Sequence, residues 1–178
     1  YVTNHYQEKR NPNFPKPKER DGSAPSTDHL YRNDGGHFSN VSLQAGIKNE
    51  GYGLSTLIAD VNRDGWPDGY VANDFVFDDL LYLNDRRGGF TENLHEAVGH
   101  TSRFSMGSDI ADFNNDGWPD VFVADMMPED ARRQKLMNQG SSNDLFNRSL
   151  REGYVPQYSR NVLQLSTGLQ PNGMVSFR

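Results

Sequence analysis

Short apolar runs, each closed by a cluster of glycine, asparagine and aspartate, recur along this chain. Residues 69–73 read Gly-Tyr-Val-Ala-Asn, and residues 121–125 read Val-Phe-Val-Ala-Asp. Runs of this length, rich in β-branched and aromatic residues, are typical of β-strands. The units that contain them sustain no 3.6-residue periodicity, which argues against leucine-rich and helical solenoid repeats. The pattern therefore predicts an all-β chain.

The strand-like runs belong to an internal repeat. Residues 58–68, Ile-Ala-Asp-Val-Asn-Arg-Asp-Gly-Trp-Pro-Asp, return at 110–120 as Ile-Ala-Asp-Phe-Asn-Asn-Asp-Gly-Trp-Pro-Asp, an offset of 52 residues (58 to 110). Residues 30–34 (Leu-Tyr-Arg-Asn-Asp) match 81–85 (Leu-Tyr-Leu-Asn-Asp). Glycine-rich turns follow both, as in β-hairpins, because glycine tolerates positive φ. Units of about fifty residues with several short strands have the size of a four-stranded propeller blade.

The ends of the chain resemble interrupted repeats. Residues 1–4 (Tyr-Val-Thr-Asn) resemble 70–73, and 161–166 resemble the strand that opens a unit. We expect a β-propeller segment of a longer polypeptide, with about two whole blades, partial blades and a short helical insertion. The predicted organisation is the end of a preceding blade at 1–6, a Pro-rich loop insertion at 7–27, propeller repeats with an acidic loop at 28–79 and 80–125, a helical insertion at 126–160, and the start of a next repeat at 161–178.

Two of the three connections between repeats are long. The connection from 73 to 81 is short, whereas those from 4 to 30 and from 125 to 163 carry the two insertions. Equivalent junctions of a propeller emerge on one face. The second insertion predicts a helix from 128 to 140 and another over 142–151. We hypothesise that the insertions bind a partner; the alternative is that they cover a neighbouring blade or close the domain.

Charge and composition exclude several classes of protein. The net charge of −6 disfavours nucleic acid as a partner, because phosphate binding needs a basic face. The chain has no cysteine, which excludes disulfides, zinc–thiolate sites and thiol nucleophiles from these residues. No apolar run approaches the roughly 20 residues that span a bilayer.

The repeated acidic loops carry the candidate chemistry. Side-chain oxygens occur at relative positions 1, 3, 5 and 9, a glycine at position 6 permits a sharp turn, and the carbonyl at position 7 can complete a ring of ligands. All-oxygen ligation from flexible loops with three carboxylates favours calcium over magnesium. We therefore predict two Ca²⁺ sites. The candidate ligands are Asp60, Asn62, Asp64, Trp66 (carbonyl) and Asp68 in the first loop, and Asp112, Asn114, Asp116, Trp118 (carbonyl) and Asp120 in the second.

Three other kinds of loop have similar sequences. One Asp-x-Asn-x-Asp-Gly could be a solvated Asx turn, but two copies with every ligand position kept in step argue for a site. An EF-hand needs a bidentate glutamate at position 12 and a following helix, whereas this chain has Val71 and Val123 there, in strand-like runs. Dockerin-like modules are excluded for the same lack of a helix. Trp66 and Trp118 are expected to pack within blades rather than to stack on a ligand.

The acidic loops and the strands after them resemble the FG-GAP or VCBS repeats of integrin-type β-propellers. The units are also similar to bacterial proteins related to cartilage acidic protein, which often carry an ASPIC/UnbV region; these residues contain none. The resemblance implies an extracellular or outer-membrane-exposed propeller that binds calcium through the loop ligands named above. The matching elements are residues 30–34, 59–68, 70–73, 126–130 and 161–165.

The sequence favours a binding scaffold over an enzyme. It contains no Gly-x-Ser-x-Gly, phosphate loop or dinucleotide fingerprint, and its five histidines have no metal-ligand spacing. The expected partner is a cell-surface protein or glycan, or an outer-membrane complex. The alternatives are an architectural subunit of an outer-membrane assembly and a polysaccharide lyase-like enzyme with catalytic residues elsewhere. A calcium site with a dissociation constant of about 0.1 mM adds roughly 1.4 kcal/mol at about 1 mM calcium and almost nothing in cytosol, which favours an extracellular location.

Overall fold

The computed structural model describes residues 1–5, 9, 11–137 and 142–178. Most of its regular structure is β-strand, so the predicted all-β class is confirmed; closure into a ring of blades stays a prediction. The elements are β1 (Tyr31–Asn33), β2 (Phe38–Asn40), β3 (Gly53–Ala59), β4 (Asp68–Asn73), β5 (Leu80–Asn84), β6 (Phe90–Glu92), α1 (Leu94–Ala97), β7 (Thr101–Ser102), β8 (Ser105–Ala111), β9 (Asp120–Asp125), α2 (Ala131–Met137), α3 (Asn143–Arg151), β10 (Gln157–Tyr158), β11 (Val162–Gln164), β12 (Ser166–Leu169) and β13 (Val175–Phe177).

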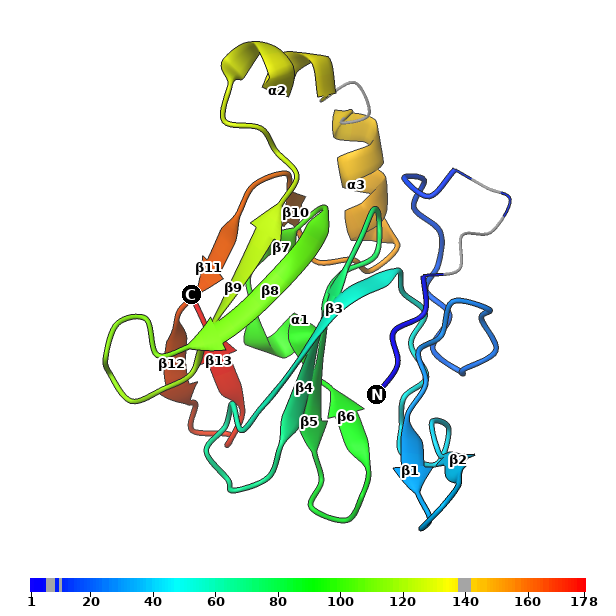
Figure 1. Ribbon diagram of the computed structural model, residues 1–178. Helices are drawn as coiled ribbons and strands as arrows, with labels where there is room; N and C mark the ends of the chain where they lie inside the picture. The colour runs from blue at the N-terminus through cyan, green and yellow to red at the C-terminus, as the bar shows by residue number, and fades with distance from the viewer. Residues whose placement is uncertain (6–8, 10, 138–141) are drawn as a thin grey trace.

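Two antiparallel sheets form the body of the molecule (Figure 1). One has the strand order β3-β4-β5-β6. The other has the order β11-β9-β8, and the hairpin β12-β13 follows β11 along the chain. The strands β3 and β8 lie side by side, and the hydroxyl oxygens of Ser55 and Ser108 are 2.8 Å apart between them.

The boundaries of the sheets differ from the boundaries of the sequence repeats. The strands β3 and β4 come from the unit at 28–79, whereas β5 and β6, which complete their sheet, come from the next unit. In the same way, residues 162–164 pair with β9 and extend the second sheet. The reason is that short hairpin connections place consecutive antiparallel strands next to each other, so a sheet is closed by the strand that opens the next sequence unit.

The main core lies between the two sheets and the short helix α1, which no periodic pattern in the sequence predicts. Its buried members are Val61, Tyr70, Leu81, Leu94, Ala97, Val98, Val121, Val123, Val155, Val175 and Phe177. Helix α1 contributes Leu94 and Ala97, both 2% exposed. The Glu92 carboxylate accepts the Leu94 N–H at 2.7 Å, so a side chain from β6 satisfies a free donor at the start of the helix.

The same hydrogen bond occurs at three junctions between consecutive units. At each junction the preceding segment ends in Asn or Asp, and the next unit opens with a new strand. In each, a side-chain oxygen before the opening strand accepts the N–H of the residue that closes the previous strand. The three pairs are Asn4 N–H with Asp28 Oδ1 at 2.7 Å, Asn73 N–H with Asp79 Oδ1 at 2.9 Å, and Asp125 N–H with Asn161 Oδ1 at 2.8 Å.

Whether the acceptor at a junction is a carboxylate or an amide goes with the aromatic residue three positions before the N–H donor. Where that aromatic residue is a tyrosine, the acceptor is an aspartate. The Tyr1 hydroxyl donates to Asp28 at 2.8 Å, and the Tyr70 hydroxyl donates to Asp79 at 2.6 Å. The third junction has Phe122 in this place, which offers no hydroxyl, and its acceptor is the amide of Asn161. A carboxylate therefore stands where two donors meet, and a neutral amide stands where there is one.

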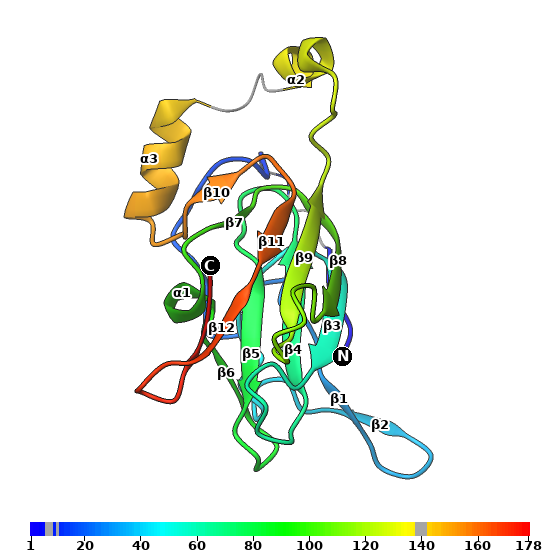
Figure 2. The same cartoon turned by 90° about the vertical axis from the view of Figure 1, so that its left-hand side faces the viewer.

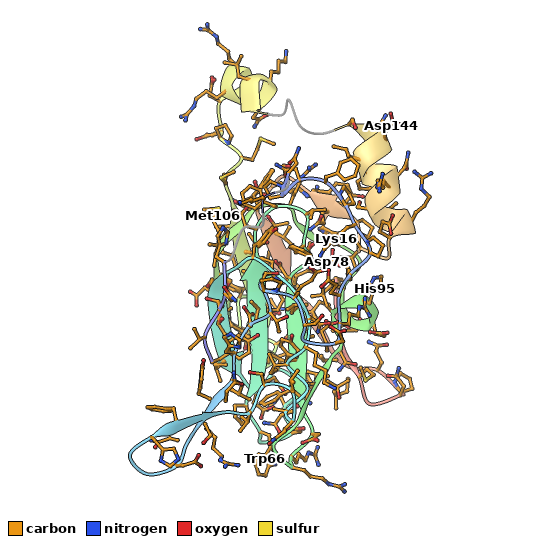
Figure 3. The ribbon with its side chains drawn as sticks, turned by 90° about the vertical axis from the view of Figure 1, so that its right-hand side faces the viewer. Lys16, Trp66, Asp78, His95, Met106 and Asp144 are labelled. Atoms are coloured by element: carbon orange, nitrogen blue, oxygen red, sulfur yellow. The ribbon has the colours of Figure 1, made fainter. Side chains whose placement is uncertain are left out.

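The two insertions lie together at the end of the sheets opposite Trp66 (Figure 3). Arg148 of α3 donates through Nε to the Pro15 carbonyl at 3.2 Å, and its guanidinium lies 4.3 Å from the Phe14 ring centroid. The Tyr154 hydroxyl donates to the Lys16 carbonyl at 3.0 Å. The helix predicted over 142–151 is confirmed as α3, with Ser142 as its N-cap, accepting the Leu145 N–H at 3.1 Å.

The helix predicted from residue 128 is α2, which stands away from the sheets (Figure 2). Asp130 accepts the Arg133 N–H at 2.9 Å and so caps its first turn. The predicted end of this helix near Gly140 lies outside the described residues. Within the described ranges, no helix combines the length and apolar character needed to cross a membrane.

Candidate metal-binding loops

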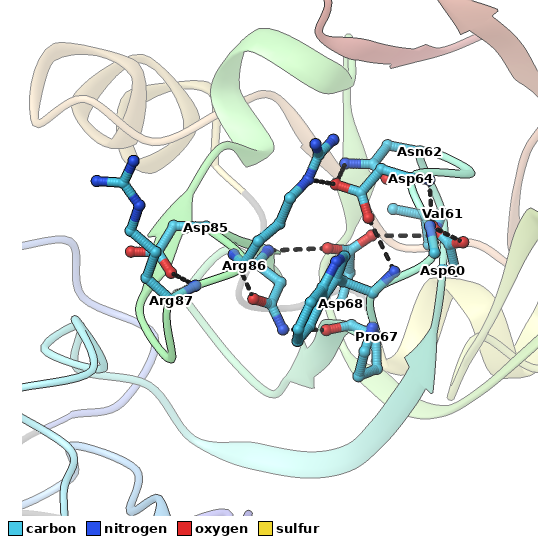
Figure 4. Close-up of polar contacts among 12 residues, drawn as sticks. Asp60, Val61, Asn62, Asp64, Pro67, Asp68, Asp85, Arg86 and Arg87 are labelled. Atoms are coloured by element: carbon cyan, nitrogen blue, oxygen red, sulfur yellow. Dashed lines mark hydrogen bonds and ion pairs between the residues drawn. The ribbon is translucent and has the colours of Figure 1, made fainter.

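The first acidic loop joins β3 to β4, and the pairing of Ala59 with Asp68 closes it at its base (Figure 4). The Asp60 carboxylate accepts the N–H of Asp64 at 2.9 Å and of Gly65 at 2.7 Å. Arg63 and Gly65 have positive φ angles of 58° and 88°, which turn the chain sharply around that carboxylate. The first ligand position is therefore held by backbone donors from the middle of the loop.

The next two positions are oriented in the same way. Asn62 Oδ1 accepts the Asp64 N–H at 3.0 Å, and Asp64 Oδ1 accepts the Trp66 N–H at 2.9 Å. Desolvation acts to raise the pKa of Asp64, but the Trp66 N–H and the Arg86 guanidinium outweigh it and lower that pKa. Asp64 is accordingly ionised at neutral pH.

Asp68 connects the loop to the sheet. Its side chain is buried, with 1% of the residue exposed, and Oδ2 accepts the Val61 N–H at 3.0 Å while Oδ1 accepts the Asn84 N–H at 2.8 Å. Burial raises the pKa of Asp68, and the charges of Asp64 and Asp60 raise it further. The loop thus gathers carboxylates that repel one another, an arrangement that a cation would stabilise.

The second loop, between β8 and β9, repeats these contacts. The carboxylate at position 9, Asp120, is fully buried and bridges its own loop to the start of β12, as Asp68 bridges the first loop to the end of β5. The equivalent hydrogen bonds are Asp116 N–H to Asp112 Oδ1 at 3.0 Å, Gly117 N–H to Asp112 Oδ2 at 2.8 Å, Asp116 N–H to Asn114 Oδ1 at 2.9 Å, Trp118 N–H to Asp116 Oδ1 at 2.8 Å, Phe113 N–H to Asp120 Oδ2 at 2.9 Å, and Ser166 N–H to Asp120 Oδ1 at 2.8 Å.

The fit of a cation to these loops rests on their donor chemistry. Nowhere in the described residues do three or more His, Asp or Glu side chains converge as a ready-made metal site. Each ionised carboxylate has about four lone-pair positions, however, and the backbone contacts above use one or two of them. The remaining acceptors are all oxygens, which suit a hard divalent cation such as Ca²⁺.

The two tryptophans of the loops have different surroundings. The Trp118 ring lies over Gly168 of β12, where an added Cβ would come within 3.1 Å of a ring carbon, and the Arg63 guanidinium lies 5.3 Å from the ring centroid. Trp66 is 45% exposed. The predicted packing role therefore holds for Trp118 and not for Trp66.

Sequence reasoning missed the cation beside the first loop. Arg86, in the β5–β6 turn, donates from Nε to Asp64 Oδ2 at 3.1 Å. The two residues are 22 positions apart, and nothing in the repeat pattern pairs them. The one sequence signal for this contact is that Arg86 lies two residues after Asn84, in the hairpin turn that follows the first loop.

A second group that sequence reasoning missed lies near the insertions. Burial raises the pKa of Asp79 to about 7 and also raises that of Asp78. Asp78 forms a short ion pair with Lys18 of the Pro-rich insertion. Asp78 and Asp79 join separate segments of the fold. They were missed because two consecutive aspartates in a sequence look like a solvent-exposed acidic turn.

Comparison with known families agrees with this geometry. Residues 60–123 match the family model described as an FG-GAP-like repeat, and the match begins at the first residue of the first loop and ends within β9. No curated protein matches the chain. The matched stretch contains both acidic loops in full.

Proposed function

We propose that this chain, built around the FG-GAP-like repeat at 60–123, is a calcium-binding scaffold on the outside of a cell that holds a partner and performs no catalysis itself. The observation that carries the proposal is the pair of acidic loops, in which every backbone hydrogen bond that orients a carboxylate in one copy has its counterpart in the other. Two copies of one oxygen-rich arrangement are hard to explain by the fold alone, because other hairpins of this chain close with short glycine turns.

The loop residues would hold the ion and transmit its effect to the sheets. Asp60, Asn62, Asp64, Asp68 and the Trp66 carbonyl would be its ligands in the first loop. Bound calcium would neutralise the repulsion between these carboxylates. Because Asp68 also accepts the Asn84 N–H, fixing this side chain fixes the join between β4 and β5.

A calcium titration of the chelator-treated chain tests the proposal. We expect calorimetry to detect two sites and the melting temperature to rise with calcium, with a much smaller response to magnesium. The Asp64→Asn/Asp116→Asn double variant, which removes one charge from each loop, is expected to lose most of the response. Neither calcium uptake nor a higher melting temperature in the parent chain would contradict the proposal.

An extracellular or cell-surface location follows from the affinity expected of such loops. A site with a dissociation constant of about 0.1 mM fills at about 1 mM free calcium and stays empty at cytosolic concentrations. In a bacterium the corresponding place is the outer surface of the outer membrane. Digestion of the chain by protease added to intact cells would support this location, and complete protection would oppose it.

The partner is proposed to bind where the two insertions meet. Residues 11–20 and 142–158 pack on each other through the Arg148 and Tyr154 contacts, and α2 lies at the same end of the sheets, opposite the acidic loops (Figure 3). The proposed surface consists of these two segments and α2. Binding residues concentrate in segments that a rigid sheet positions. A cell-surface protein or a glycan is the partner class that suits an extracellular scaffold.

A further inference from the structure

The segments that follow β5 and β11 share a pattern of hydrogen bonds, although an insertion separates them in sequence. Asn84 donates its N–H to Asp68 Oδ1 at 2.8 Å, and Ser166 donates its N–H to Asp120 Oδ1 at 2.8 Å. The side chain of each then accepts the N–H two residues further on, at 2.8 Å from Arg86 and at 3.2 Å from Gly168. Arg86 and Gly168 therefore occupy one position in two copies of the unit.

This position requires a left-handed backbone. Gly168 has φ 75°, and Gly35, whose N–H donates to Asn33 in the first hairpin, also has φ 75°. Arg86 adopts φ 65° at the same place. A residue with a side chain is strained in this region, whereas glycine is not. The strain indicates that the Arg86 side chain serves a purpose that its two glycine counterparts do not.

The contact that Arg86 makes identifies the purpose. Its Nε lies 3.1 Å from Oδ2 of Asp64, the fifth position of the first loop. Asp64 is mostly buried, with 11% of its side chain exposed, and the same oxygen accepts a hydrogen bond from Asn62 at 3.2 Å. In the second copy the Trp118 ring covers Gly168, which offers no cation to Asp116.

Another arginine lies near the second loop but is used differently. Arg63 extends from the first loop to the second, where its guanidinium stacks at 5.3 Å from the Trp118 ring centroid. Within the described contacts its partner is an aromatic ring, whereas Arg86 is paired with a carboxylate that we assign as a ligand. The two loops therefore offer the same oxygen atoms to an ion, but only the first has an arginine paired with one of its carboxylates within the described contacts.

We propose that Arg86 is a built-in counter-ion that makes the first loop bind a divalent cation more weakly than the second, so that the second loop fills first. The inference rests on the proposed function, because it concerns calcium binding by the same loops. An ion that enters the first loop must displace Arg86 from Asp64 or share that carboxylate with it. In either case a divalent ion and a guanidinium repel each other across a few ångströms, and repulsion of this size lowers affinity about fivefold to tenfold.

Calorimetric calcium titrations of chelator-treated variants test the proposal one loop at a time. The Asp116→Asn substitution weakens calcium binding by the second loop, so a titration of that variant measures the first loop. The Asp60→Asn substitution weakens the first loop, so a titration of that variant measures the second. Arg86→Gln added to Asp116→Asn is expected to raise calcium affinity about fivefold to tenfold, and added to Asp60→Asn to change it less than about twofold. Salt at 0.5 M should reduce the Arg86 effect by screening.

Arg87→Gln is the matched control, because it removes the same charge from the neighbouring position, where the side chain points away from the loop (Figure 4). It should change neither affinity by more than about twofold. Two sites of equal affinity in the parent chain, or an Arg86→Gln variant that binds like the parent, would overturn the role of Arg86 and leave the calcium function standing. Absence of calcium binding in every variant would overturn both.

Discussion

Asp79 lies fully buried immediately before β5, where it accepts hydrogen bonds from the Tyr70 hydroxyl and the Asn73 N–H. These two donors stabilise its charge, but the loss of water and the nearby Asp78 outweigh them and raise the pKa of Asp79 to about 7. Asp28, at the equivalent junction, has a pKa raised to about 6 by the same loss of water. At the scale of single residues, the junctions between units therefore hold acids that take up protons on folding.

The pH dependence of stability should follow from Asp79. Its folded pKa lies above the unfolded value near 3.9, so between about pH 4 and pH 7 the folded state keeps a proton that the unfolded state has lost. The free energy of unfolding is therefore expected to fall as pH rises through this window, by at most about 4 kcal/mol from this residue. Urea unfolding in the presence of chelator, at pH 5 and pH 8, measures the fall.

The third junction supplies the control for this prediction. A Tyr70→Phe/Asp79→Asn variant copies the pair Phe122 and Asn161, which makes the same backbone hydrogen bond without a titrating group. We expect its stability to change much less between pH 5 and pH 8 than that of the parent. An equally steep change in this variant would assign the dependence to other groups.

At the scale of elements, ion pairs hold the Pro-rich insertion against the sheets. Lys18 pairs with Asp78 and lies 4.5 Å from the centroid of the Tyr154 ring. Two residues earlier, Lys16 Nζ lies 2.8 Å from Glu50 Oε2. Asp78 also accepts the Val155 N–H at 3.3 Å, so one buried carboxylate joins the Pro-rich insertion to the segment after α3.

Lys18→Met should loosen both insertions, because it leaves the Asp78 carboxylate buried without its cation. Removal of one partner from a buried pair costs about 3–5 kcal/mol, and partial exposure of Lys18 places this case at the lower end. The loss should be larger at pH 8 than at pH 5, since Asp78 can take up a proton at the lower pH. Hydrogen exchange of residues 14–20 and 153–157 measures the loosening.

A second substitution separates the lost ion pair from a general packing defect. Asp78→Asn added to Lys18→Met keeps an acceptor for the Val155 N–H and removes the uncompensated charge. Most of the lost protection should return in this double variant. Protection that stays low would indicate that the Lys18 side chain acts through packing, for example on Tyr154.

At the scale of the whole molecule, the two sheets separate two ends with different proposed roles. The acidic loops lie at one end, and the paired insertions lie at the other (Figures 1 and 3). Calcium in the loops would act on the joins between strands, whereas a partner would contact α2, α3 and the Pro-rich segment. Substitutions on the insertion end should therefore affect partner binding without affecting the calcium response.

Leu136→Asp tests this separation. Leu136 of α2 is 59% exposed, so the change should leave the melting temperature and the calcium response close to those of the parent. Binding to whichever glycan or outer-membrane extract protein the parent retains is expected to fall about tenfold, as for an apolar residue at the centre of an interface. A scaffold should bind members of a glycan panel without depleting them, whereas depletion would indicate an enzyme.

The control for this prediction is Phe38→Asp, because Phe38 of β2 is 69% exposed and lies away from the insertions (Figure 1). It should leave partner binding unchanged. Equal losses in the two variants would contradict a binding site on the insertions.

Local features of this chain could be predicted from its sequence because the interactions that form them are local. The hydrogen bonds that shape each acidic loop join residues two to seven positions apart, so the repeated nine-residue pattern already specifies them. Helix α3 likewise follows from its Ser142 cap and from the basic residues Arg148 and Arg151 in its last turn. Helix α1 was missed because its four residues are stabilised by burial of Leu94 and Ala97 against the sheets rather than by a repeating pattern.

The sequence alone specified the strand-like runs next to the acidic loops, the two loops and their shared side-chain oxygens, and the positions of the insertions. Only the tertiary structure decided which distant residues meet: Arg86 with Asp64, Lys18 with Asp78, and Arg148 with Pro15. The physical reason is that each of these contacts depends on how the sheets and turns bring separate segments to one place. A sequence repeat specifies the units and their internal bonds, but the charges placed between units depend on the packing.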